Sequence, residues 1–151
     1  MRYELVIPIE PKPKARPRAT VIAGHASVYT PKETRVFEAK IAAIAAEKIP
    51  KPLEGPVRIG LAFYMTRPKR LYRKKDPDGW IYNPSRPDLD NLEKAVTDGL
   101  QSIAYKDDSQ IVEKVSSKRF HEKPNTGSVE EMYDKWNARP RIVIVVEEVG
   151  A

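Results

Sequence analysis

The sequence predicts a single compact α/β domain of the α+β type over residues 1–151, in which a mixed β-sheet packs against two main helices. Two observations carry this prediction. Over Val57–Thr66, apolar residues take every second position, as in a strand with one buried face. Over Leu89–Ile103, apolar residues recur at intervals of three and four, as along one face of a helix. The length of 151 residues suits one domain, and no repeat divides the chain.

The first predicted elements are an edge strand and a hairpin. Tyr3–Ile9 has the alternation of a strand, and Pro8 favours an edge position because proline cannot donate a hydrogen bond to a neighbouring strand. Thr20–Ala23 and Val28–Thr30 flank the turn-forming residues 24–27, which predicts a short hairpin.

A helix is predicted to follow the hairpin. Thr30 can cap it, Pro31 suits its first turn, and Glu33 completes a capping box. Apolar residues then recur at helical spacing until Pro50, which ends the helix. The strand at Val57–Thr66 comes next.

The second half of the chain begins with a long loop, 67–87, that contains four prolines. Loops of this length in compact domains are usually functional or disordered. The second helix follows, and Ile111–Phe120 and Arg141–Val149 are predicted strands. Between these strands, residues 121–137 are polar and irregular, with a helical turn predicted at Val129–Trp136.

Composition excludes several classes of site. The chain has no cysteine and therefore no disulfide, thiolate metal site or cysteine nucleophile, and its two histidines are too few for most zinc sites. No apolar run approaches the ~20 residues that a membrane span needs. Residues 1–8 carry an acid and a proline within an apolar stretch, unlike a secretion signal. We therefore expect a cytoplasmic protein with no membrane contact.

Charge is distributed unevenly along the chain. The formal net charge is +6 and the pI is about 9.5, which favours a polyanionic partner and a nucleoid-associated location. Residues 67–86 carry seven Lys or Arg against two acids, whereas residues 87–110 carry two Lys against six acids. This order could hold a phosphate backbone beside a metal site. The basic residues predicted to contact DNA are Lys12, Lys14, Arg16, Arg18, Arg67, Lys69, Arg70, Arg73, Lys74, Lys75 and Arg86.

The basic run in the 67–87 loop has a second interpretation, because such runs are also typical of solvated loops. Its aromatic residues Tyr72, Trp80 and Tyr82 could stack on unpaired bases. Trp80 and Tyr82 could equally pack together as a small cluster of the loop itself.

The acidic stretch contains two short motifs, DLDNLEK at 88–94 and YKDDSQ at 105–110. One interpretation is helix punctuation, with Asp88 as an N-cap and Asp90 favouring the helix dipole. The other is a Mg²⁺ site, because Asp is a hard oxygen ligand and these two acids flank one residue at a chain reversal. Lys94, one helical turn beyond Asp90, would then stabilise the charge that develops on a phosphate.

These motifs resemble the signature of the RusA family of Holliday-junction resolvases. The upstream segments 11–18 (PKPKARPR) and 29–32 (YTPK) also resemble RusA-like proteins of phages and prophages. The resemblance implies a homodimeric, Mg²⁺-dependent endodeoxyribonuclease that nicks four-way junctions symmetrically in DNA recombination and repair. Matched position by position, it implies that Lys94 is the catalytic lysine and that the metal-binding carboxylates are Asp88, Asp90 and Asp108. Asp107 matches a further acidic position whose role is less defined.

The mechanism that the resemblance implies is hydrolysis. One or two Mg²⁺ ions would activate a water that attacks the phosphorus in line, without a Ser or Cys nucleophile. The sequence departs from the short members of the family in the long loop 67–87 and the insertion at 121–137. Both differences leave the substrate preference open.

Chain geometry favours an active site shared between two subunits. If the second helix runs from Asp90 to Ala104, it carries the chain ~21 Å at ~1.5 Å per residue. The following residues to Asp108 can return at most ~13–14 Å. An antiparallel pairing of this helix across a two-fold axis would place Asp107 and Asp108 of one chain beside the acids at 88–90 of the other. A helix that ends early, near 99–102, would instead allow a site within one chain.

Two other functions fit the same sequence. One is a non-catalytic nucleic-acid-binding module whose acids only cap a helix, and the other is a basic protein that binds acidic partners. Metal-dependent cleavage of a synthetic four-way junction separates these alternatives from the nuclease.

Overall fold

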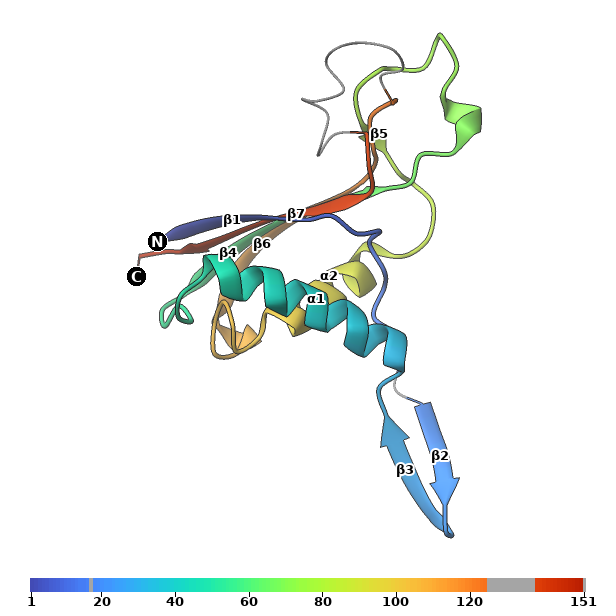
Figure 1. Cartoon of the computed structure of the whole chain (residues 1–151). Coiled ribbons are helices and arrows are strands. Elements are labelled where there is room, and N and C mark those ends of the chain that lie inside the picture. The colour runs from blue at the N-terminus through green and yellow to red at the C-terminus, as the bar shows by residue number, and fades with distance from the viewer. Residues whose placement is uncertain (17, 125–137, 151) are drawn as a thin grey trace.

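The computed structural model describes residues 1–16, 18–124 and 138–150. It contains a five-stranded sheet of order β1-β7-β4-β6-β5, a separate two-stranded hairpin and two α-helices (Figure 1). β4 and β6 are parallel, and the other neighbours in the sheet are antiparallel, so the predicted mixed α+β fold is confirmed. The strands of the sheet are β1 (Arg2–Ile7), β4 (Val57–Met65), β5 (Ile81–Tyr82), β6 (Ile111–Phe120) and β7 (Arg141–Glu148).

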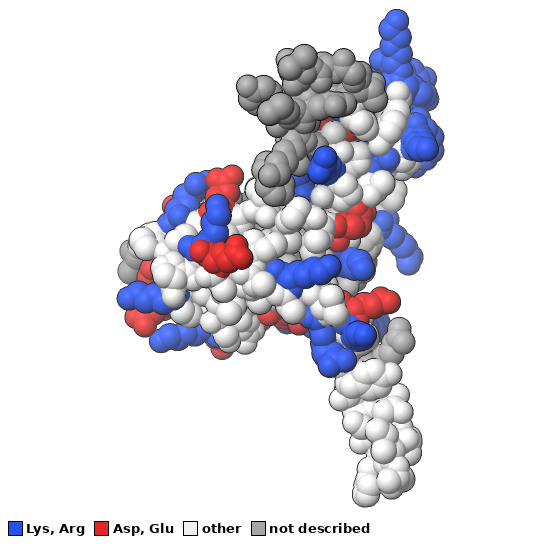
Figure 2. All heavy atoms as spheres, viewed as in Figure 1, with Lys and Arg blue, Asp and Glu red and all other residues white. Residues whose placement is uncertain are grey.

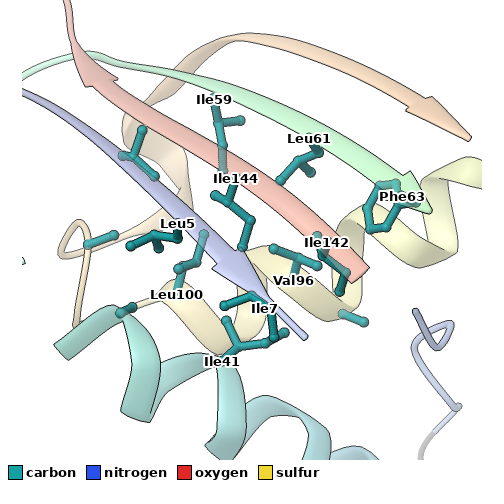
Figure 3. Packing of buried hydrophobic residues seen from close by; sticks show 14 of the residues in the cluster. Leu5, Ile7, Ile41, Ile59, Leu61, Phe63, Val96, Leu100, Ile142 and Ile144 are labelled. Atoms are coloured by element: carbon teal, nitrogen blue, oxygen red, sulfur yellow. The ribbon is translucent and has the colours of Figure 1, made fainter. Parts of the chain in front are cut away.

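The hydrophobic core lies between the sheet and the helices α1 (Lys32–Lys48) and α2 (Leu89–Leu100), which cover the same face of the sheet (Figure 1). Alternate residues of β4 point into this core, as the period of two predicts. Ile59 and Leu61 are 0% and 3% exposed, and Figure 3 shows them on the same side of the sheet as Val96 of α2. The strand pattern therefore fixes which face receives the helices.

The start of α1 differs from the prediction. Pro31 occupies the N-cap position, and no side chain caps the helix there, so the predicted capping box of Thr30 and Glu33 is wrong. The physical reason is position, because Thr30 lies one residue before the N-cap and cannot act as the capping side chain. The predicted end is confirmed: α1 stops at Lys48, two residues before Pro50.

The hairpin consists of β2 (Arg18–Ile22) and β3 (His25–Tyr29) and projects from the body of the protein (Figure 1). Its turn is at Ala23 and Gly24, which both have positive φ, so the predicted turn at 24–27 lies too late in the sequence. One face consists of the apolar pairs Ala19–Val28 and Val21–Ala26. From Ala19 to Tyr29 the hairpin has no Lys, Arg, Asp or Glu, and it is uncoloured in the space-filling view (Figure 2).

The remaining predicted elements agree with the structure to within a few residues. β1 lies at the edge of the sheet, as Pro8 predicts, and β6 has the predicted bounds. Most of the predicted insertion at 121–137, including the helical turn at Val129–Trp136, lies outside the described residues. In the part of the chain that the structure describes, neither helix has the length and apolar character that a membrane span requires.

Candidate active site

A pocket of about 350 Å³ lies between α2 and the start of β6. Asp90, Lys94 and Thr97 reach it from one face of α2, because residues three and four apart share a helix face. Asp108 enters from the short 3₁₀ helix η2 (Asp108–Gln110). Residues Ile111, Val112, Glu113 and Lys114 of β6 complete the lining. Three of the four residues predicted to be catalytic therefore line one pocket.

Lys94 lies between two carboxylates. Its Nζ is 2.9 Å from Oδ1 of Asp98 and 3.8 Å from Oδ2 of Asp108. The hydrogen bond with Asp98, together with the charges of Asp98 and Asp108, raises the pKa of Lys94 above its usual value. Lys94 is therefore a protonated ammonium near neutral pH, and it brings a positive charge to the pocket.

Asp108 reaches the pocket because α2 ends early. The helix stops at Leu100, and Ser102 adopts a positive φ of 73° that turns the chain. Tyr105 is fully buried and donates a hydrogen bond of 2.8 Å to the carbonyl oxygen of Thr97, which satisfies a backbone group near the end of α2. Burial raises the pKa of the Tyr105 hydroxyl, so this hydroxyl remains a donor at neutral pH.

This early end corrects the premise of a shared active site, which was a helix that runs to Ala104, and it fits the alternative of a helix that ends near 99–102. A helix running to Ala104 would have carried Asp108 away from Asp90. The helix ends at Leu100 instead, and the turn that follows brings Asp108 into the same pocket as Asp90 within one chain.

Gln110 holds the loop that carries Asp108. Its Oε1 accepts hydrogen bonds from the backbone amides of Lys106 (2.8 Å) and Asp107 (3.0 Å). Its Nε2 donates to the carbonyl oxygens of Leu53 and Gly55, at 2.8 and 3.0 Å. These hydrogen bonds fasten the loop to the segment before β4, so the last residue of the DDSQ motif is structural. No role for this residue was predicted from the sequence.

Asp107 acts as a cap in this loop. It is the N-cap of η2 and accepts a hydrogen bond from the amide of Ser109, in a capping box with Gln110. The pKa of the Asp107 carboxyl lies below its usual value. The largest cause is a hydrogen bond with the Asp108 side chain, and hydrogen bonds from backbone amides lower it further. Asp107 does not line the pocket, whereas Asp108 does.

Asp88 lies on the other side of the start of α2. It is the N-cap of α2 and lines a neighbouring pocket of about 490 Å³ with Lys14, Arg86, Asn91 and two prolines. Within the described ranges, no three His, Asp or Glu side chains are gathered so that they could hold a metal ion. The pocket between α2 and β6 itself offers three exposed carboxylates, those of Asp90, Asp108 and Glu113. Glu113 pairs with Arg58 at 2.7 Å, whereas Asp90 and Asp108 belong to the two predicted motifs.

Most of the basic residues predicted to contact DNA are exposed. Figure 2 shows Lys and Arg side chains gathered at the end of the protein opposite the hairpin. The side chain of Arg18, the first residue of β2, is outside the described part of the structure. Lys14 is mostly buried, and its ammonium pairs with Glu38 and Asp98. The exposed residues of the set are Lys12, Arg16, Lys69, Arg70, Arg73, Lys74, Lys75 and Arg86.

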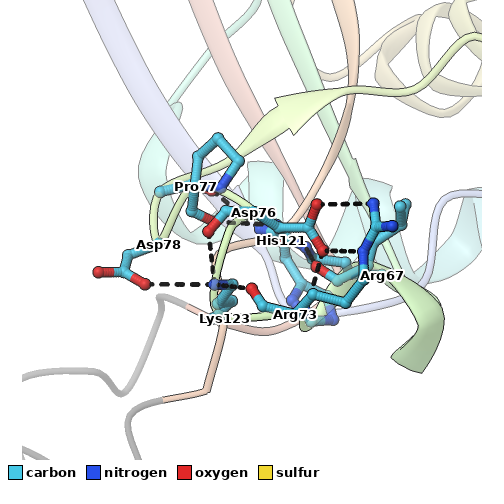
Figure 4. A network of polar contacts seen from close by, with 9 residues as sticks. Arg67, Arg73, Asp76, Pro77, Asp78, His121 and Lys123 are labelled. Carbon is cyan, nitrogen blue, oxygen red and sulfur yellow. Dashed lines mark hydrogen bonds and ion pairs between the residues drawn. The ribbon is translucent and has the colours of Figure 1, made fainter.

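Arg67 does not fit the prediction of a DNA contact, because it is 1% exposed. Its guanidinium group donates hydrogen bonds of 2.9 Å to the carbonyl oxygens of Leu71, Pro77 and Gly79 (Figure 4). Arg67 therefore fixes the loop between β4 and β5 from inside. A run of basic residues in a sequence does not reveal which of its members turns inward.

Arg73 and the aromatic residues of the loop also make contacts within the protein. Arg73 pairs with Asp76 through two hydrogen bonds of 3.0 Å. The ring of Trp80 meets that of Tyr82 edge to face, and the guanidinium of Arg119 lies 3.8 Å from the Trp80 centroid. The structure therefore contains the small cluster of Trp80 and Tyr82 that was the alternative to base stacking, although Tyr82 is 69% exposed.

Two comparisons with known proteins cover the pocket. The sequence model of a family described as endodeoxyribonuclease RusA matches residues 8–147, a range that contains every residue lining the pocket. The uncharacterized protein YqaN of Bacillus subtilis (strain 168) is 31% identical over 121 residues, which covers 76% of this chain and 85% of that protein.

Proposed function

Because the chain belongs to the RusA endodeoxyribonuclease family, we propose that it is a Mg²⁺-dependent endonuclease that resolves Holliday junctions in DNA recombination and repair. The observation that carries the proposal is the pocket, where Asp90, Lys94 and Asp108 come together within one chain. Carboxylates that can bind a metal and an ammonium that can contact a phosphate are the groups that phosphodiester hydrolysis requires.

The donor set of the pocket suits Mg²⁺. This ion binds proteins through one or two carboxylates and completes its coordination with water and phosphate oxygens. We assign the ligand role to Asp90 and Asp108 from their shared pocket, and to Asp88 from the family resemblance. When bound, the ion would supply an activated water and offset the negative charge of the phosphate.

The side chains of the pocket support hydrolysis by water. Thr97, which lines the pocket, is buried and donates its hydroxyl to the carbonyl oxygen of Lys94, so it is not free to attack a phosphate. Lys94 is 54% exposed at its side chain and can therefore contact a phosphate oxygen. Its role would be to stabilise the charge that develops as the phosphorus is attacked.

The DNA would approach over two groups of exposed basic residues. Lys12 and Arg16 belong to the segment before the hairpin, and Arg86 lies just before α2. Lys69, Arg70, Lys74 and Lys75 belong to the loop between β4 and β5, where Arg73 is instead paired with Asp76. Contacts of these cations with phosphates would supply affinity that does not depend on sequence.

We also propose that the protein acts as a homodimer, which would present two pockets to the two strands that a junction resolvase cuts. The hairpin supports this part of the proposal, because Val21 and Val28 on its apolar face are 72% and 71% exposed. An isolated two-stranded hairpin is only marginally stable in water, so a second copy that covers this face would stabilise it.

The test is cleavage of a synthetic four-way junction labelled on each strand, with Mg²⁺ or with a chelator. We expect Mg²⁺-dependent nicks in the unmodified protein, and no cleavage by Asp90→Asn or Asp108→Asn although both variants still bind the junction. The amide keeps the size of the side chain and removes the ligand charge. Binding without cleavage by the unmodified protein would instead support the non-catalytic nucleic-acid-binding module.

A further inference from the structure

We propose that Asp98 is a positioning residue that holds the ammonium of Lys94 at the edge of the pocket; this inference rests on the proposed function. Asp98 does not line the pocket and was not among the residues that the sequence indicated. Its two carboxylate oxygens bind two different lysines. Oδ1 lies 2.9 Å from Nζ of Lys94, and Oδ2 lies 3.1 Å from Nζ of Lys14.

Lys14 fixes Asp98 from the side away from the pocket. Its Nζ also pairs with Oε1 of Glu38 on α1, and its backbone amide donates a hydrogen bond of 2.9 Å to the carbonyl oxygen of Asn91 on α2. Lys14 therefore joins the segment after β1 to both helices. The side chains of Lys14 and Asp98 are only 21% and 18% exposed, whereas that of Lys94 is 54% exposed, so the support is more buried than the group it holds.

The close approach of the two helices makes this arrangement possible. Gly99 follows Asp98, and a Cβ built there would lie 3.2 Å from the carbonyl oxygen of Glu38 and from the side chain of Ile41. A larger residue would force α1 and α2 apart at the level where Glu38, Lys14 and Asp98 meet.

Stability of α2 alone does not explain Asp98. Asp98 lies in the last turn of α2, which ends at Leu100, and the helix dipole disfavours negative charge there. In addition, a lysine four residues before an acid is the less favourable order for a pair on a helix. The two lysines that Asp98 binds are a better explanation.

The contact with Asp98 also keeps Lys94 away from a proposed metal ligand. Nζ of Lys94 is 2.9 Å from Asp98 but 3.8 Å from Asp108. Without Asp98, the flexible side chain of Lys94 would be free to pair directly with Asp108. In that pair, the ammonium of Lys94 would no longer be available to a phosphate, and the carboxylate of Asp108 would no longer be available to a metal ion.

The inference is tested by the rate constant of junction cleavage in a single turnover at saturating enzyme, measured with Mg²⁺. We expect Asp98→Asn to lower this rate constant about 10- to 100-fold, by analogy with the loss of a hydrogen-bond partner that orients a metal ligand. The dissociation constant for the junction and the thermal unfolding temperature should change little. Asp98→Glu should recover part of the rate, and Lys14→Ala should have a smaller effect than Asp98→Asn.

The decisive comparison uses Lys94→Ala as background. If Asp98 acts through Lys94, Asp98→Asn changes the rate no further once Lys94 is removed. An equal additional decrease in that background would overturn the inference. The control is Asp76→Asn, the same substitution at a similarly buried acid that pairs with Arg73 outside the pocket, and it should leave the rate constant unchanged. An unmodified protein that does not cut would refute the proposed function, and this inference with it.

Discussion

The loop between β4 and β5 and the pocket beside α2 both place cations next to oxygen atoms, but they use these charges differently. In the loop, Arg67 is 1% exposed and its N–H groups are occupied by backbone carbonyl oxygens. In the pocket, the side chains of Lys94 and Asp108 are 54% and 44% exposed and lie 3.8 Å apart. The first set of charges fixes a chain segment, and the second remains accessible to a ligand.

Two properties distinguish a structural charge from an accessible one: the exposure of the side chain, and whether its hydrogen-bonding groups already have partners in the protein. The sign and density of charge do not distinguish them. Lys123 in the loop network donates to the carbonyl oxygens of Arg73 and Asp76, at 2.6 and 2.5 Å (Figure 4). These hydrogen bonds satisfy the loop's backbone groups internally, as buried or partly buried polar groups require.

Among substitutions of the cations, the largest effect is expected at Lys94. Lys94→Ala should lower the single-turnover rate constant of junction cleavage by ~10²–10³, the range for removal of an electrostatic stabiliser. Binding of the junction should change little, because most of the affinity comes from other phosphate contacts. A variant that only binds more weakly, with an unchanged rate at saturation, would mean that Lys94 anchors a phosphate and does not stabilise the transition state.

Arg67→Ala should act on stability instead. The substitution leaves three carbonyl oxygens without their donor, and we expect the free energy of unfolding to fall by about 3 kcal/mol. Urea denaturation measures this change. Arg70→Ala, at an exposed position of the same loop, should change stability by less than about 0.5 kcal/mol. Similar values for the two variants would contradict the structural role of Arg67.

A smaller effect is expected from the exposed cations of the loop. Replacement of Lys69, Arg70, Lys74 and Lys75 by alanine should weaken junction binding. It should also reduce the log–log slope of affinity against salt by ~0.9 for each phosphate that the protein no longer neutralises. Arg73→Ala is the matched control, because Arg73 already pairs with Asp76. A slope that is the same in the fourfold variant and the unmodified protein would show that the loop does not touch DNA.

The sequence predicted the fold well where one face of an element is buried. The alternation in β4 and the helical spacing in α2 both come from contact with the same core, so periodicity reports them directly. Predictions failed where several local signals compete. Thr30, Pro31 and Glu33 together suggest a capping box, but the helix begins one residue later than that motif needs.

The sequence predicted the proposed catalytic residues that line the pocket, but it did not predict the residues that hold them in place. Short motifs identified Asp90, Lys94 and Asp108, which the structure brings to one pocket. The supports are Asp98, held by Lys14 from a distant segment, and Gln110, held against residues before β4. These interactions depend on tertiary packing, and no spacing along the chain reveals them. The same limit explains why Arg67 was assigned to DNA, since burial is not encoded in a run of basic residues.

The smallest expected effect is no effect at all, in a complementation experiment. Asp90→Asn and Asp108→Asn are mixed under conditions that allow subunit exchange, and nicking of a labelled junction is measured. In the structure, Asp90 and Asp108 of one chain line the same pocket, because α2 ends at Leu100 and Tyr105 fastens the turn. Every pocket in the mixture then lacks one carboxylate, and no activity should return. A mixture of Asp90→Asn with unmodified protein is the control for exchange, since its heterodimers keep one complete pocket and should nick one strand. Nicking by the mixture of the two variants would show that two chains share each active site after all, with the acids of one chain completing the pocket of its partner.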